Sequence, residues 1–112
     1  MPRHNSLAQL ELFVLLSLFR RGGSAYSAEV RHEIKTRTGR RVSLAAVFVT
    51  LTRLEDRGFV SSEISDPRPV PGGRARKRFL LKPTGLEALQ SAVTQLRAML
   101  EEVPEPLGLD LR

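Results

Sequence analysis

Residues 42–58 read VSLAAVFVTLTRLEDRG, the most informative pattern in the chain. Its apolar residues recur at three- and four-residue steps, which is the spacing of one face of an α-helix. That inner stripe consists of Leu44, Val47, Leu51 and Leu54. Ser43 is a suitable N-cap before the stripe, and a glycine at position 58 is a suitable stop. We therefore predict a helix that begins after Ser43 and ends before residue 58.

The following residues, 59–82, read FVSSEISDPRPVPGGRARKRFLLK and predict a hairpin. Apolar residues share a side within 59–65 and again within 76–82, which indicates two strands. The loop between them, at 66–75, holds three prolines and two glycines, so it cannot continue either strand. The tip and the return strand are basic. Their cations are Arg68, Arg74, Arg76, Lys77, Arg78 and Lys82.

Two helices are expected before this region. Residues 7–20 are apolar on more than one side, so this helix should be buried over most of its surface. A second helix is expected at 25–38, with Ser24 as its N-cap. One face of that helix carries Tyr26, Val30 and Ile34 at four-residue spacing.

The last helix has two alternative starts. Pro83 suits the first helical position, with Lys82 as its N-cap. Thr84 and Glu87 match a capping box instead, and the sequence leaves both frames open. Apolar residues then follow a heptad spacing up to residue 103. This narrow seam favours a second copy of the chain as its partner, whereas the alternative is packing on its own domain. The predicted dimerisation residues are Leu86, Leu89, Val93, Leu96, Leu100 and Val103, joined by Leu10 and Phe13 from the first helix.

Composition narrows the class of protein. The 112 residues suffice for one domain with a modest core. The net charge is +6, but residues 101–112 carry −3, so residues 1–100 carry +9. A basic body of this size attracts polyanions, most often nucleic acid. The chain has no cysteine, which fits a reducing compartment, and we expect it in the cytoplasm.

The sequence offers little for catalysis. His4 and His32 are isolated from any carboxylate cluster, so no metal site is expected. Gly72 and Gly73 lie in a hairpin with no helix start behind them, so they do not form a phosphate-binding loop. We predict no enzyme activity and no cofactor. The apolar run at 7–19 falls short of the ~20 residues that a membrane-spanning helix needs, and no membrane partner is expected.

A helix with a small outer face beside a basic hairpin is typical of a domain that holds duplex DNA. We expect the outer face of 44–57 to contact bases or backbone, with Thr50 and Arg53 contributing most. The hairpin should contact phosphates or the minor groove, with Arg74 and Lys77 contributing most. The alternatives are a plain core helix and a solvated charge run. The predicted DNA-binding residues are Tyr26, Arg40, Arg41, Ser43, Ala46, Val49, Thr50, Arg53, Arg68, Arg74, Arg76 and Lys77.

The order of elements, and the text at 25–30, 47–60, 72–79 and 83–86, resembles the short form of the PadR-like family of winged helix-turn-helix transcriptional regulators. The resemblance covers about residues 7–100. It implies a homodimeric DNA-binding repressor whose last helix packs against the partner subunit. It also implies that a small hydrophobic effector is a candidate ligand at the dimer interface.

Three positions depart from the family pattern. Phe48 replaces a common tyrosine, Arg78 stands where an aromatic residue is frequent, and Lys82 replaces a capping threonine. These departures leave the expected fold class unchanged. It is mainly α (α+β), a winged helix-turn-helix with a two-stranded wing and a C-terminal dimerisation helix. We divide the chain into a DNA-binding domain at 1–82, a dimerisation helix at 83–103 and an acidic tail at 104–112. The expected function is sequence-specific regulation of transcription on an inverted repeat. The alternative is a winged-helix module that binds protein or RNA.

Overall fold

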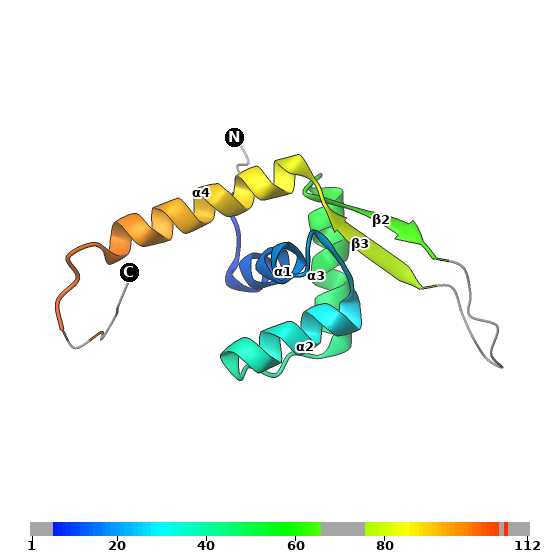
Figure 1. The fold of residues 1–112 in the computed structure, drawn as a ribbon, viewed down its shortest axis with the longest axis horizontal. Coiled ribbons are helices and arrows are strands. Elements are labelled where there is room, and N and C mark those ends of the chain that lie inside the picture. The colour runs from blue at the N-terminus through cyan, green and yellow to red at the C-terminus, as the bar shows by residue number, and fades with distance from the viewer. Residues whose placement is uncertain (1–5, 66–75, 106, 108–112) are drawn as a thin grey trace.

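The computed structural model describes residues 6–65, 76–105 and 107 of the chain. It contains four helices and a small three-stranded sheet (Figure 1). The elements follow the predicted order, with one short strand added. They are α1 (Gln9–Arg20), β1 (Ser24–Tyr26), α2 (Ser27–Thr38), α3 (Leu44–Asp56), β2 (Val60–Ile64), β3 (Lys77–Leu81) and α4 (Pro83–Leu100).

The sheet is antiparallel, with strand order β1-β3-β2. Phe79 sits at its centre, opposite Ala25 on one side and Ser62 on the other, and is completely buried. The predicted hairpin is thus confirmed, and the wing gains a third strand. The strands β2 and β3 and the helix α4 project from opposite sides of the helical body (Figure 1).

The third strand corrects the predicted start of the second helix. Ser24 is not an N-cap, because it pairs with Leu80 in the sheet and is extended. Tyr26 is the N-cap instead, and its backbone N–H donates to Glu29 Oε1 at 2.9 Å. Pairing with β3 supplies backbone hydrogen bonds that a helical turn at 24–26 would otherwise make.

The core lies where α1, α2 and α3 meet the sheet and the first half of α4. In α3 the stripe of Val47, Leu51 and Leu54 is fully buried, as predicted, but Leu44 in the first turn is 42% exposed. Each fully buried aliphatic side chain contributes roughly 1.5–3 kcal/mol relative to an exposed one. The fully buried side chains of largest volume are Phe79, Leu15, Leu18, Leu51, Leu54, Val14, Val30, Val47 and Val60.

The start of α4 settles the two predicted frames in favour of Pro83 at the first helical position, with Lys82 as N-cap. The hydroxyl of Thr84 donates to the carbonyl oxygen of Gly58. Gly85 approaches the loop before β2 so closely that a Cβ there would lie 2.1 Å from the carbonyl oxygen of Phe59. The helix therefore docks through a glycine against the loop that joins α3 to β2.

Two predicted members of the dimerisation seam need correction. Leu89 is only 3% exposed because it packs in the core of its own domain. Val103 lies beyond the helix, since α4 ends at Leu100 and Glu102 has a φ of 55°. Among the described residues, no helix is long and apolar enough to cross a membrane.

Candidate nucleic-acid interface

The exposed side of α3 carries small side chains. Val49 is 52% exposed, Arg53 is exposed, and Ala46 is half-buried on the flank. Ser43 caps the helix, with its Oγ accepting a hydrogen bond from the Ala46 backbone N–H at 3.0 Å. The first turn contains no acidic residue, so its free N–H groups present an uncompensated positive end. This surface can approach a polyanion closely.

Thr50 does not belong to this surface, which corrects the prediction. It is 4% exposed, and its hydroxyl donates to the Ala46 carbonyl oxygen at 2.8 Å. The inner stripe recurs at 47, 51 and 54, and position 50 borders that stripe, one helical turn before Leu54. A base-reading role for Thr50 is therefore wrong.

Two further positions on the outer side of α3 are not among the predicted contacts. Stepping from Val49 by four residues back and three forward leads to Ala45, which is exposed, and Thr52, which is half-buried. Within the described residues, the hydroxyl oxygen of Thr52 is buried and has no hydrogen-bond partner. Phe48 is 41% exposed and sets its ring edge-on against Phe79 at 5.9 Å between centroids. Helical stepping from Val49 could have identified the first two.

The link before α3 presents Arg40 and Arg41, both exposed. Arg40 is partly tied down, because its Nη1 donates to Gln9 Oε1 at 3.0 Å and its backbone N–H donates to Thr38 Oγ1 at 3.0 Å. These contacts hold Arg40 near the first residue of α1. Arg41 lies one residue nearer to the capped end of α3.

The cations at the base of the wing are split among different partners. Lys77 Nζ lies 3.8 Å from Glu55 Oε1 and 5.6 Å from the centroid of the Phe48 ring, so it faces α3. Arg78 turns to β1 and donates to Ser24 Oγ. The predicted residues Arg68 and Arg74 lie outside the described residues.

Arg76 stacks on Tyr26, with the guanidinium carbon 3.7 Å from the ring centroid. Both side chains are half-buried. The ring face of Tyr26, a predicted DNA-binding residue, is therefore already occupied by a cation. The wing base and the N-cap of α2 therefore form one unit.

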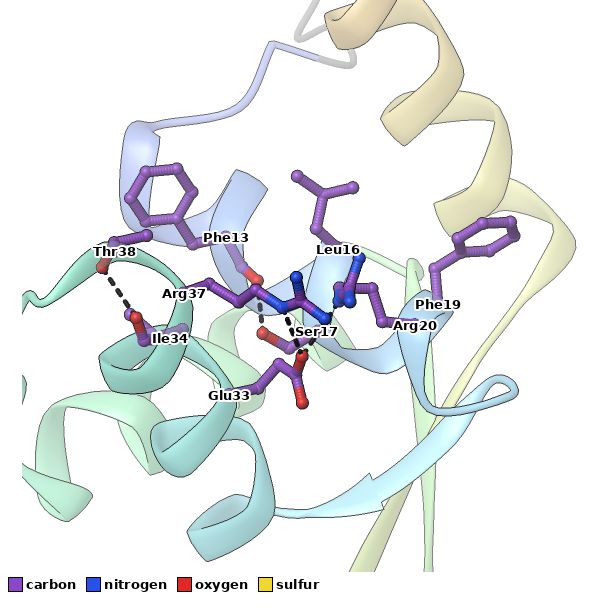
Figure 2. A pocket seen from close by; sticks show the side chains of 9 residues that line it. All are labelled: Phe13, Leu16, Ser17, Phe19, Arg20, Glu33, Ile34, Arg37 and Thr38. Atoms are coloured by element: carbon purple, nitrogen blue, oxygen red, sulfur yellow. Dashed lines mark hydrogen bonds and ion pairs between the residues drawn. The ribbon is translucent and has the colours of Figure 1, made fainter.

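Several other arginines are held by glutamates away from this surface. Arg57 Nη1 lies 2.9 Å from Glu11 Oε1. Glu33 Oε2 lies 2.9 Å from Arg20 Nε and 3.3 Å from Arg37 Nε (Figure 2). Arg21, the residue after α1, lies 3.4 Å from the other carboxylate oxygen of Glu33. The hydrogen bond from Arg20 is the main cause that lowers the pKa of Glu33 below its ordinary value, and the charge of Arg20 adds to it while desolvation opposes it. These arginines serve the fold.

Beside Glu33, the side chains of α1 and α2 enclose an open groove of about 630 Å³. Figure 2 shows its wall, with Phe13, Leu16 and Phe19 on α1 and Ile34 on α2. A second groove of about 650 Å³ lies between the start of α1 and the far half of α4. It is lined by Ser6, Leu7, Leu12, Ser91, Ala92, Gln95, Leu96 and Met99. Both grooves lie on the helical body and not on the wing.

The predicted dimerisation residues divide into two groups. Leu10, Phe13, Leu86 and Val93 are half-buried against their own core. Leu96 is 51% exposed and Val103 37% exposed, and Leu100 is half-buried at the helix end. The far half of α4 is therefore the part that presents apolar surface.

In the ranges 6–65, 76–105 and 107, no three or more His, Asp or Glu side chains form a group that could hold a metal ion. His32 lies 3.4 Å from the Thr36 hydroxyl on the exposed side of α2.

Comparison with known proteins gives one family and one fold. The model of the "Transcriptional regulator PadR-like family" matches residues 15–91. No curated protein matches the chain. A PadR family transcription regulator from Clostridium difficile R20291 superposes with a TM-score of 0.71 at 18% identity, over 84% of this chain and 93% of that chain.

Two further structures share the fold. A PadR-like transcription factor from "bacteroid fragilis" has a TM-score of 0.71 at 23% identity, over 82% of this chain and 84% of that chain. F93 from STIV, described as a winged-helix DNA-binding protein, has a TM-score of 0.69 at 16% identity, over 88% of this chain and all of that chain. The chain and these structures have the same winged-helix architecture.

Proposed function

Because the chain belongs to the PadR-like family of transcriptional regulators, we propose that it binds duplex DNA sequence-specifically as a homodimer and represses transcription. The main support for this proposal is the position of two surfaces. An exposed face of small residues on α3 lies directly beside the cationic base of the wing. Lys77, which lies near the Phe48 ring of α3, joins the two surfaces.

The proposed docking places α3 in the major groove. Ala45, Ala46 and Val49 are small enough to let the helix backbone approach base edges, and methyl groups of this kind contact thymine. Arg53 lies one turn further along α3, where it can donate to a guanine or a phosphate. The wing would follow the backbone beside the groove. Salt dependence should therefore be steep, with roughly one unit of slope for each phosphate contact.

The proposed dimer uses the far half of α4. Leu96 and Met99 are 51% and 78% exposed, and they line the groove with Leu12 of α1 and with Leu7, which precedes that helix. Covering this surface with a second α4 would remove large apolar side chains from water, at about 25 cal/mol per Å². Two-fold symmetry would then set the two α3 helices about one turn of DNA apart, at an inverted repeat.

We also propose the α1–α2 groove as the seat of a small hydrophobic effector. Its wall of Phe13, Leu16, Phe19 and Ile34 is apolar, and its volume of about 630 Å³ falls in the range of small-molecule sites. Titration of the dye 1-anilinonaphthalene-8-sulfonate tests it. Fluorescence should rise on binding and should fall in Leu16→Asn, with Thr94→Asn on the exposed side of α4 as the matched control.

The function itself is tested by selecting bound sites from random duplexes with the purified protein. An enriched inverted repeat, and loss of retention as salt rises, would support the proposal. Enrichment of single-stranded RNA, or capture of an acidic protein without any duplex preference, would favour the interaction module instead. Arg53→Ala should weaken duplex binding, whereas Arg97→Ala removes the same charge from α4 and should not.

A further inference from the structure

Two residues that lie fifty positions apart in sequence meet at the base of the wing. The Arg76 guanidinium carbon lies 3.7 Å from the centroid of the Tyr26 ring. The antiparallel pairing of β1 with β3 brings them together, because Tyr26 is opposite Arg78 and Arg76 is two residues further along on the same side of the strand. The Arg78 side chain also donates to Ser24 Oγ, which is a second side-chain contact between β3 and β1 in the same register.

Stacking uses the flat face of a guanidinium and leaves its edge available. The five N–H donors of arginine lie in the plane of the group, so a stacked arginine can still donate to a phosphate. Among the described residues, no carboxylate lies within 4.0 Å of Arg76, whereas Lys77 next to it has Glu55 at 3.8 Å. The Tyr26 ring therefore orients the Arg76 guanidinium, and no carboxylate of the described residues neutralises its charge.

We propose that Tyr26 is a positioning residue, whose ring holds the Arg76 guanidinium in place to donate its edge to a DNA phosphate. This inference rests on the proposed function. The tyrosine acts through its π face, and its hydroxyl is dispensable. Arg76 reaches the phosphate with less loss of side-chain entropy on binding, because its rotamer is already selected.

The experiment measures the dissociation constant for a fixed duplex over a range of salt concentrations. The variants are Arg76→Ala, Tyr26→Phe, Tyr26→Leu and the double variant Tyr26→Leu/Arg76→Ala. Arg76→Ala should weaken binding and lower the salt slope by about one unit. Tyr26→Phe should bind as the wild type does, because phenylalanine keeps the ring face. Tyr26→Leu should weaken binding roughly 3- to 10-fold, since an aliphatic side chain gives no cation–π attraction.

The double variant separates positioning from a general structural effect. If Tyr26 acts through Arg76, the losses are not additive, and Tyr26→Leu costs little once Arg76 is gone. Additive losses, or a Tyr26→Phe variant as weak as Tyr26→Leu, would overturn the inference. A wild-type protein that binds no duplex would instead overturn the proposed function. Thermal unfolding of each variant checks that the N-terminus of α2 stays folded.

Discussion

Arg57 Nη1 lies 2.9 Å from Glu11 Oε1, and this ion pair joins the end of α3 to the first turn of α1 across 46 residues of chain. Glu11 also accepts the Ala8 backbone N–H at 2.9 Å, and Arg57 donates to the Ser6 carbonyl oxygen at 2.7 Å. The Glu11 side chain is 7% exposed, so the pair is largely withdrawn from water. It fixes α3, the candidate recognition helix, to α1, which packs against α4.

Removal of this carboxylate should destabilise the fold. Glu11→Ala removes the carboxylate that pairs with the half-buried Arg57 and removes the cap of the first turn, at a cost of about 2–4 kcal/mol. Urea unfolding monitored by circular dichroism measures it. Glu87→Ala, on the exposed side of α4, is the matched control and should change the free energy of unfolding little. Equal midpoints for the two variants would contradict the anchoring role of Glu11.

The Glu33 cluster predicts a pH dependence of stability. The hydrogen bond from Arg20, together with its charge, lowers the pKa of Glu33 below the ordinary 4.5, so the folded state favours the ionised carboxylate. Its contribution is therefore present above pH 4.5 and is lost as pH falls through the lower folded pKa. Glu33→Gln should lose stability at pH 7 but should lose less than the wild type on acidification. Unfolding curves at pH 7 and below pH 4 test this, and parallel behaviour of the two proteins would refute it.

The close approach of α4 to the loop before β2 predicts a strong effect of one methyl group. In Gly85→Ala the new Cβ would overlap the Phe59 carbonyl oxygen, which is backbone and cannot swing away. We expect a loss of about 1–3 kcal/mol, as for overpacking in a core, although alanine is the better helix former. Thr94→Ala on the same helix is exposed and should be neutral or slightly stabilising. The thermal midpoint of each variant is the measurement.

A negative charge on the exposed face of α3 should weaken DNA binding strongly and leave the fold intact. Val49 is 52% exposed, so Val49→Glu is tolerated in the free protein but faces phosphates in the complex. A loss of at least about 10-fold in affinity is expected by gel shift. Thr94→Glu adds the same charge to α4, on the other side of the molecule from the wing, and should retain binding. If both variants retain DNA binding, α3 is not the recognition helix.

The apolar end of α4 should decide the oligomeric state. Leu96→Asp places a charge at the centre of the exposed surface, where burial in a dimer is costly, and should shift the protein to monomers at micromolar concentration. Sedimentation equilibrium measures this. Gln90→Asp, exposed on the same helix, is the control and should remain dimeric. A wild-type protein that sediments as a monomer would contradict the proposed dimer.

Periodicity in the sequence determined where the helices lie and which residues face inward, because a helix must bury its apolar stripe. Val47, Leu51 and Leu54, the cap at Ser43 and the hairpin strands were all predictable on that basis. A three-residue strand such as β1 gives no periodic signal, so the sequence predicts Ser24 as a helix cap instead. Residues Ser24–Tyr26 form a strand because they pair with the edge of β3.

Tertiary packing decided what periodicity alone could not. Thr50 is polar and is predicted on the outer face, yet it is buried, and its hydroxyl donates to the Ala46 carbonyl oxygen. Leu89 belongs to the predicted heptad seam, but it packs into the core of its own domain and is not available to a partner. The stacking of Arg76 on Tyr26 depends on a strand register that the sequence does not encode locally. The amphipathic pattern is set by neighbours along the chain, whereas burial and pairing depend on segments that meet only after folding.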